Sequence, residues 1–156
     1  MSAGWPEKSW KSLDGEALAH SFKVNAIGPA LVAKHFMALL TSQRKSVFAV
    51  LSARVGSIED NRLGGWHAYR ASKAALNMLM RTCSIELARR NANAICVSLH
   101  PGTVDTALSR PFQTNVPAGK LFPTALAASQ LLTVIDNLDV SASGGFYAWD
   151  GERIPF

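Results

Sequence analysis

The order in which short apolar runs and long helical patterns alternate is the feature that most limits the folds open to this sequence. The run Ser46–Leu51 consists mainly of apolar strand-forming residues without polar alternation, which is typical of a parallel strand buried on both faces. Ala92–Leu99 has the same character, and Gly144–Trp149 is a shorter third candidate. Apolar side chains recur at helical spacing in the stretches 16–40, 67–90 and 123–137. This alternation predicts an α/β fold with a short parallel sheet and right-handed crossovers, organised as a single domain over the whole chain.

The first helical pattern has a recognisable start and an interruption. Asp14 precedes it and is suited to the N-cap position, because its carboxylate can accept hydrogen bonds from free backbone N–H groups of the first turn. Gly28 and Pro29 interrupt the pattern, since proline disrupts a helix interior, so a bend or two abutting helices are expected there. Residues 1–13 are expected to be irregular.

Composition and charge argue against several classes of protein. Hydrophobic residues make up 48% of the 156 residues and charged residues 17%, so the chain is expected to be globular rather than disordered. The net charge is +5, but the basic residues are scattered and no basic run interleaves aromatic residues, so nucleic-acid binding is not expected. No apolar run is long enough to span a membrane and no signal peptide is visible, so a cytoplasmic location is expected. Cys83 and Cys96 lack neighbours of metal-ligand type and are expected to be reduced and packed, so no metal site is predicted.

Tyr69 and Lys73 stand four residues apart at the start of the second helical pattern. Residues at this spacing lie above one another on the same face of a helix, so the phenol and the ammonium share one side. A lysine cation beside a tyrosine favours the phenolate and is expected to lower the phenol pKa from its ordinary value of about 10. A tyrosine tuned in this way can donate and accept a proton near neutral pH. The alternative interpretation is a surface lysine beside a packed tyrosine, with no chemical role.

Other polar residues fall where the two main strands end. Ser52 directly follows the first strand, and the segment Pro101–Thr106 follows the second. Because ligands of open α/β sheets bind outside the carboxyl ends of the strands, these residues are expected to lie near Tyr69 and Lys73. A serine hydroxyl in that position can donate a hydrogen bond to a substrate carbonyl while the tyrosine supplies the proton.

Four motifs at these positions, in their order and spacing, resemble the short-chain dehydrogenases/reductases. The motifs are Val-Asn-Ala-Ile-Gly-Pro around Asn25, Leu-Ser-Ala-Arg-Val-Gly-Ser around Ser52, Tyr-Arg-Ala-Ser-Lys from Tyr69 to Lys73, and Pro-Gly-Thr-Val-Asp-Thr from Pro101. The second motif and the stretch 60–66 are similar to the C-factor-like, or sniffer-like, branch of carbonyl reductases. The resemblance covers nearly the whole chain and implies a partial Rossmann-like fold of three layers.

The resemblance implies a hydride transfer between NAD(P)H and a small-molecule carbonyl or alcohol. Tyr69 would then be the general acid and base, and Lys73 would lower its pKa and hold the ribose next to the nicotinamide. Ser52 would polarise the carbonyl, and Asn25 would hold a water molecule that links the lysine to solvent. Ser57 is the alternative serine, because the family usually places its serine closer to the tyrosine. Ser52 is preferred because it ends the strand.

The same resemblance implies a set of cofactor-binding residues: Tyr69, Lys73, Pro101, Gly102, Val104 and Thr106. The backbone after Pro101 and Gly102, near Val104, would bind the carboxamide of the nicotinamide. Thr106 would lie on the phosphate side of the cofactor. The resemblance favours NADP over NAD.

Two motifs of the family are not found in this sequence. They are the Gly-x-x-x-Gly-x-Gly turn that binds the pyrophosphate and the Asn-Asn-Ala-Gly segment that normally comes before Asn25. The chain is therefore expected to be the C-terminal part of such an enzyme, with most of the catalytic residues and only part of the cofactor site. The alternative function is a non-catalytic signalling or interaction module of the C-factor-like type.

Two further expectations concern surfaces. The long loop 107–122 holds several apolar residues and is expected to be a mobile lid over an apolar substrate, or alternatively to pack on the third helix. These residues are Leu108, Pro111, Phe112, Val116 and Leu121. The strand Ser46–Leu51 is expected to be an exposed sheet edge, and the helices around 25–40 and 69–87 carry wide apolar stripes. A homodimer or higher oligomer through these helices, or association through the strand edge, is therefore expected.

Overall fold

The computed structural model describes residues 7–156, apart from the side chains of Pro111, Phe112 and Asn115. The first six residues of the stretch expected to be irregular, and two of the apolar side chains expected in the lid, therefore lie outside the described residues. The helices are α1 (Gly15–Phe22), α2 (Gly28–Phe36), α3 (His67–Ala88) and α4 (Thr124–Asn137). The strands are β1 (Ser46–Leu51), β2 (Ala94–His100), β3 (Thr103–Val104), β4 (Leu121–Phe122) and β5 (Phe146–Ala148).

The main sheet consists of β1, β2 and β5 in that order, and all of its pairs are parallel. This confirms the predicted α/β fold with a short parallel sheet. The central strand β2 is buried along almost its whole length, whereas β1 is only half-buried. The prediction that Ser46–Leu51 is buried on both faces is therefore wrong, because β1 is the outer strand of the sheet within residues 7–156. The third strand is also shorter than predicted.

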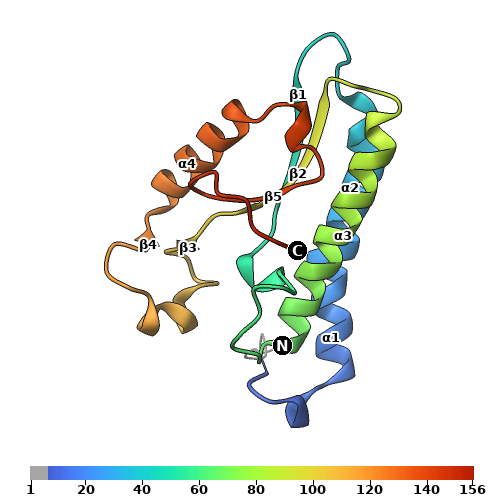
Figure 1. Cartoon of the computed structure of the whole chain (residues 1–156). Coiled ribbons are helices and arrows are strands. Elements are labelled where there is room, and N and C mark those ends of the chain that lie inside the picture. The colour runs from blue at the N-terminus through green and yellow to red at the C-terminus, as the bar shows by residue number, and fades with distance from the viewer. Residues whose placement is uncertain (1–6) are drawn as a thin grey trace.

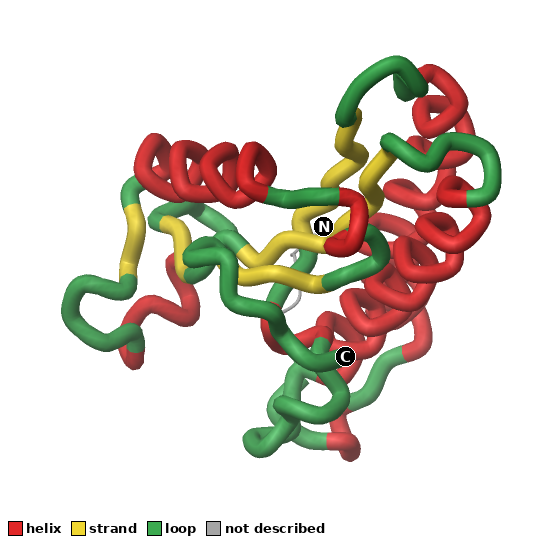
Figure 2. Tube along the Cα trace, turned by 45° about the horizontal axis from the view of Figure 1, so that its top comes forward, coloured by secondary structure: helices red, strands yellow, loops and turns green. Residues whose placement is uncertain are grey.

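The sheet lies between two layers of helices (Figures 1 and 2). Leu76 and Met80 of α3 pack with Ala33 of α2 against Ala94 and Cys96 of β2. Alternate residues of β2 point to the other face. There, Ile95, Val97 and Leu99 pack with Val134 of α4. These two clusters give the expected three layers and place the start of α3 beside the carboxyl ends of the strands.

The interruption of the first helical pattern lies earlier in the chain than predicted. Lys23–Ile27 forms a π-helical turn, and Gly28 and Pro29 begin α2 instead of ending a helix. Proline is accepted there because N–H groups in the first turn of a helix need no partner within that helix. The predicted cap of α1 is confirmed, since the Asp14 carboxylate accepts a 2.8 Å hydrogen bond from Ala17 N. Asn25 therefore lies inside the π turn, a feature that is frequent at functional sites.

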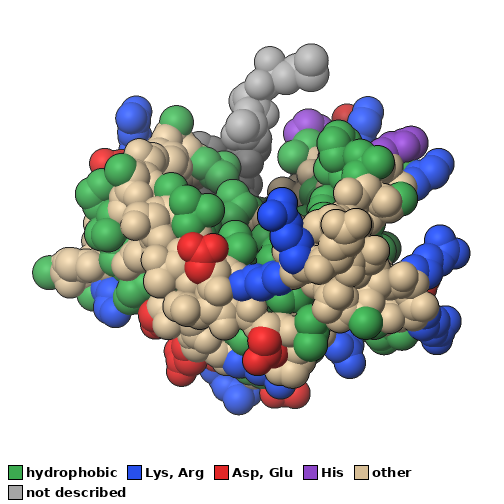
Figure 3. Space-filling view, turned by 90° about the horizontal axis from the view of Figure 1, so that it is seen from above, with side chains coloured by type: hydrophobic (Ala, Val, Ile, Leu, Met, Phe, Trp, Pro, Cys, Tyr) green, Lys and Arg blue, Asp and Glu red, His purple; other side chains and the backbone are tan. Residues whose placement is uncertain are grey.

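The long loop after β2 contains more structure than the sequence predicts. β3 pairs in parallel with β4 and closes the base of the loop, and a short 3-10 segment, Arg110–Asn115, lies between them. No helix within residues 7–156 is long and apolar enough to cross a membrane. On the face shown in Figure 3, lysine and arginine side chains are spread over the surface and do not form one patch.

Candidate active site

Three consecutive residues with positive φ lead the chain into α3. Gly64 and Gly65 have φ of 63° and 66°, and Trp66 has φ of 52°, which is uncommon for a residue other than glycine. Glu7, which is distant from this turn in the sequence, stabilises it. The backbone carbonyl of Glu7 accepts a 2.6 Å hydrogen bond from Trp66 N. The carboxylate of Glu7 also accepts a hydrogen bond from Ala68 N at 3.3 Å. These contacts set where the first turn of α3, and hence Tyr69, lies.

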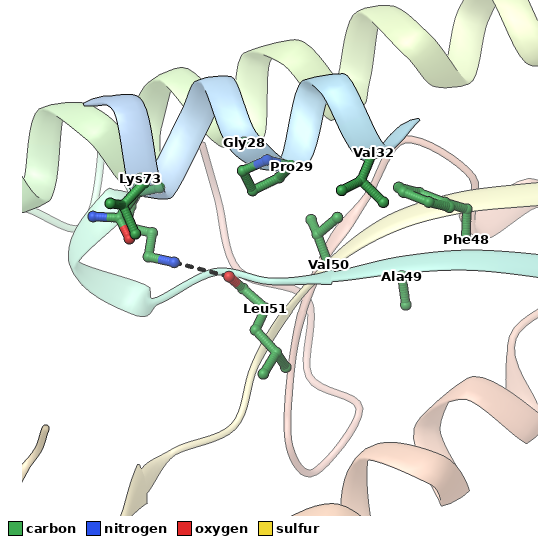
Figure 4. A pocket seen from close by; sticks show the side chains of 10 residues that line it. Gly28, Pro29, Val32, Phe48, Ala49, Val50, Leu51 and Lys73 are labelled. Carbon is green, nitrogen blue, oxygen red and sulfur yellow. Dashed lines mark hydrogen bonds between the residues drawn. The ribbon is translucent and has the colours of Figure 1, made fainter. Parts of the chain in front are cut away.

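Lys73 connects α3 to the end of β1. Its ammonium donates a 2.9 Å hydrogen bond to the backbone carbonyl of Leu51, the last residue of β1 (Figure 4). The same nitrogen lies 5.9 Å from the centroid of the Tyr69 ring, so the expected pairing on one face of the helix is present. Lys73 is only 9% exposed, which is unusual for a lysine and excludes the interpretation as a surface residue.

The electrostatics of this pair differ from the sequence-based expectation. Burial raises the pKa of Tyr69 above its ordinary value, and burial lowers the pKa of Lys73. The prediction that Lys73 lowers the pKa of the phenol is therefore wrong for this structure. The physical reason is that the loss of hydration disfavours both charged forms. The ammonium is also hydrogen-bonded to the Leu51 carbonyl and lies 5.9 Å from the centroid of the Tyr69 ring.

Gly56 allows a close approach to Lys73 that the sequence did not single out. It ends a 3-10 turn, Arg54–Gly56, that packs against α3. A Cβ at this position would lie 2.8 Å from the Cβ of Lys73 and 2.9 Å from its carbonyl carbon, so there is no room for a side chain. Gly56 is therefore part of the support that sets the position of Lys73.

The two candidate serines differ in what their hydroxyls contact. Both are buried, at 4% exposure for Ser52 and 2% for Ser57. The Ser57 hydroxyl accepts a 3.0 Å hydrogen bond from Asp60 N and so belongs to the structure of its own loop. The Ser52 hydroxyl has no hydrogen-bond partner within the described residues, although Ser52 N donates to Leu99 O at 2.7 Å. Ser52 therefore has the hydroxyl that is free of a structural role.

Asn25 reaches the start of α3 through a second residue. Its amide nitrogen donates a 3.1 Å hydrogen bond to the Ser72 hydroxyl, which in turn donates to Tyr69 O at 2.9 Å. Asn25 and Lys73 also line the same groove, a cavity of about 520 Å³ between β1 and the π turn and α2. Figure 4 shows Pro29 and Val32 of α2 on the helix side of this groove and Val50 on the strand side.

The predicted cofactor segment lies at the carboxyl end of the neighbouring strand β2, and it does not line that groove. Gly102 has φ of 75°, and β3 pairs Thr103 with Leu121 and Val104 with Phe122. Thr106 is exposed and its backbone N donates to the Ser109 hydroxyl at 3.2 Å. Pro101 and Gly102 are half-buried. The structure therefore brings Asn25 and Lys73 together, with Tyr69 one turn away, and places Pro101–Thr106 on the adjacent strand end.

His100 is a residue of this region that sequence reasoning missed. It is the last residue of β2, directly before Pro101, and its Nδ1 atom is buried without a hydrogen-bond partner within the described residues. Burial and the nearby Arg54 lower the pKa of His100 to about 4, against the opposing effect of Asp150. The imidazole is therefore neutral at physiological pH. The sequence signal that could have identified His100 is its position at the end of a predicted strand, directly before the predicted cofactor-binding segment.

Comparison with known proteins adds an independent line of evidence. Residues 1–117 match the family model described as short chain dehydrogenase. The C-signal of Myxococcus xanthus is 35% identical to this chain, over 92% of this chain and 81% of its own length. An uncharacterised oxidoreductase of Schizosaccharomyces pombe is 34% identical, over 97% of this chain and 60% of its own length.

Solved structures resemble this fold over almost the whole chain. Carbonyl reductase Sniffer of D. melanogaster has a TM-score of 0.84 at 26% identity, covering 98% of this chain and 62% of that structure. NADPH-bound carbonyl reductase from chicken fatty liver has a TM-score of 0.82 at 27% identity, covering 98% of this chain and 63% of that structure. This chain thus spans less than two thirds of the length of these reductases.

Proposed function

This chain belongs to the short-chain dehydrogenase family of oxidoreductases, and we propose that it carries the proton-transfer half of a carbonyl reductase site, with Tyr69 as general acid and base. The observation that carries the proposal is the pair of half-buried Tyr69 and buried Lys73, held at the carboxyl end of β1 by the bond from Lys73 to Leu51. The resemblance to oxidoreductases does not favour the alternative of a non-catalytic signalling module.

The proposed reaction reduces a carbonyl compound to an alcohol and oxidises NAD(P)H to NAD(P)⁺. When bound, the nicotinamide supplies the hydride to the carbonyl carbon. The Tyr69 hydroxyl gives its proton to the carbonyl oxygen, and the phenolate then regains a proton from solvent. The Ser52 hydroxyl stabilises the charge that develops on that oxygen by donating a hydrogen bond to it.

The residues present fit the nicotinamide side of such a cofactor. A lysine ammonium has three donors, and the bond from Lys73 to Leu51 uses one of them, so donors remain for ribose hydroxyls. Within the described residues no hydrogen bond involves the Tyr69 hydroxyl. Gly102 lets the backbone of the 101–106 segment turn at the end of β2, where a carboxamide would be held. Asn25, on the same groove as Lys73, would hold the water that reprotonates the site.

We propose NADP as the preferred dinucleotide and a small apolar ketone or aldehyde as the substrate. NADPH is the cofactor bound in the chicken carbonyl reductase, which shares the fold. Apolar side chains of the loop 107–122, such as the exposed Leu108 and the part-exposed Leu121, would contact an apolar substrate. A cytoplasmic location and a homodimer remain parts of this proposal.

Binding of reduced nicotinamide mononucleotide tests this function, because that molecule contains only the part of the cofactor that these residues would hold. Calorimetric titration of the chain with this mononucleotide and with NADPH should show saturable binding of both. Lys73→Met should abolish binding, because the donors to the ribose are lost. Lys11→Met is the control, since Lys11 is exposed in the 3-10 turn before α1, and it should retain the wild-type affinity. Equal binding by the wild type and Lys73→Met would contradict the proposal.

A further inference from the structure

The backbone that would hold the carboxamide is positioned by aromatic side chains outside its own motif. Gly102 lies so close to them that an added Cβ would be 2.6 Å from Cε2 of Phe122 and 3.0 Å from Cδ1 of Trp149. Phe122 is in β4 and Trp149 directly follows β5. The two rings come from elements far apart in the sequence, and both pack against Gly102.

The rings of Phe122 and Trp149 also pack against each other. Their centroids are 4.7 Å apart at an interplanar angle of 66°, the edge-to-face arrangement that aromatic pairs prefer. Phe122 is buried and is the register partner of Val104 in the β3–β4 pair. Asp105 N donates a 2.8 Å hydrogen bond to Phe122 O, so Phe122 is joined to the cofactor segment through its backbone as well.

Lys120 joins this group from the other end of the loop. Its ammonium lies 5.1 Å from the centroid of the Trp149 ring, within the range of a cation–π interaction. Trp149 therefore contacts Gly102, where the loop begins, and Phe122 and Lys120, where the loop ends. A single side chain at the end of β5 thus connects both ends of the loop to the main sheet.

We propose that Trp149 is a positioning residue of the reductase site, which sets the backbone of residues 101–104 for carboxamide binding through Gly102 and Phe122. This inference rests on the proposed function for its ligand, but the contacts that carry it do not involve any catalytic side chain. In this proposal Trp149 affects binding only by fixing the backbone of residues 101–104, and it does not contact the reacting atoms.

Amide hydrogen exchange of the ligand-free chain tests the positioning directly. Trp149→Leu should accelerate exchange at residues 103–106 and leave the β1–β2 pair unchanged, because only the local support is lost. Trp149→Phe keeps an aromatic edge and should restore slow exchange. Trp10→Leu is the matched control, since Trp10 also has a lysine over its ring but lies in the 3-10 turn before α1.

Ligand affinity tests the consequence for the site. Trp149→Leu should weaken binding of reduced nicotinamide mononucleotide about 3- to 10-fold, as expected from the loss of an aromatic pair. Lys120→Met removes the cation–π contact to the Trp149 ring, so it should accelerate exchange at residues 103–106 to a smaller extent than Trp149→Leu and weaken binding about twofold. If Trp149→Leu fails to fold, Lys120→Met still decides the question through the exchange rates at residues 103–106 and 120–122.

Unchanged exchange at residues 103–106 in both Trp149→Leu and Lys120→Met would overturn the proposal. Faster exchange over the whole chain in Trp149→Leu, without a local effect in Lys120→Met, would also overturn it, because it would show a general structural role. If the wild type does not bind the mononucleotide, the proposed function fails, while the exchange measurement still decides the role of Trp149.

Discussion

Lys73 donates a 2.9 Å hydrogen bond to the carbonyl of Leu51, and this bond joins the first turns of α3 to the carboxyl end of the outer strand. The bond explains how a lysine can be buried here, because its ammonium keeps one strong acceptor. It also makes the charge of Lys73 part of the stability of the chain.

The stability of the chain should depend on pH through Lys73. The pKa of Lys73 in the folded chain lies below its ordinary value of 10.5, so between these two values the unfolded chain binds more protons. The free energy of unfolding therefore rises with pH across that window, as the penalty of the buried charge is relieved. Tyr69 acts in the opposite sense above pH 10, because burial raises its pKa.

Urea denaturation of the wild type and Lys73→Met measures this effect, since taking the difference cancels the contribution of other groups. Up to about pH 10 the wild type should gain stability relative to the variant as the pH rises. A difference that stays constant from about pH 7 to about pH 10 would show that the pKa of Lys73 is not lowered.

Gly56→Ala should destabilise the chain by about 1–3 kcal/mol, the range expected for overpacking. The new Cβ would lie 2.8 Å from the Cβ of Lys73, so α3 or the 3-10 turn must shift. Gly15→Ala is the matched control, because a Cβ there meets nothing within 4 Å and the site is in the first turn of α1. Thermal unfolding of both variants measures the difference. Equal stability of Gly56→Ala and Gly15→Ala would contradict the account.

Ser52→Ala and Ser57→Ala should have opposite signatures. Ser57→Ala leaves Asp60 N without its partner and should lower the free energy of unfolding by about 1 kcal/mol, with little effect on turnover. Ser52→Ala removes a hydroxyl that has no partner and should leave stability nearly unchanged, while it lowers the rate of carbonyl reduction. If Ser57→Ala instead lowered the rate and Ser52→Ala lowered the free energy of unfolding, Ser57 would be the polarising serine.

Association of the chain should occur through the π turn and α2, one of the helical faces expected from the sequence. Ile27 and Leu31 lie one turn apart and are 50% and 52% exposed, which leaves an apolar face without a partner among residues 7–156. The double variant Ile27→Lys, Leu31→Lys should shift the chain toward monomer in light scattering. Leu63→Lys, at a 93% exposed loop position, is the control and should not change the molar mass. A wild type that is already monomeric would refute this prediction.

Much of the fold could be predicted because its signals are local. The run Ser46–Leu51 and the helix from His67 have strong periodicity or strand composition, and both lie where the sequence indicated. The half-burial of β1 agrees with the expectation of a sheet edge and not with that of burial on both faces, because burial depends on which strand lies in the middle of the sheet. The π turn around Asn25 was hidden by Gly28 and Pro29, which looked like a break and proved to be a helix start.

The site was predicted in part for a related reason. The pairing of Tyr69 and Lys73 follows from helical spacing alone, but the direction of the Tyr69 pKa depends on burial and on the bond from Lys73 to Leu51. The roles of Gly56 and Trp149 arise from contacts between distant segments, which no local pattern records. The lid over residues 107–122 stays a prediction.

Turnover by Tyr69→Phe tests the central claim most directly. The variant loses one hydroxyl, so the fold and the affinity for NADPH should be retained, while NADPH-dependent reduction of an apolar ketone should fall about 100-fold or more. Tyr147→Phe loses the hydroxyl of the other tyrosine, which makes only a long 3.4 Å bond to Ala142 O, and should keep the wild-type rate. Equal rates for the wild type and Tyr69→Phe, or no NADPH-dependent reduction by the wild type, would contradict the account.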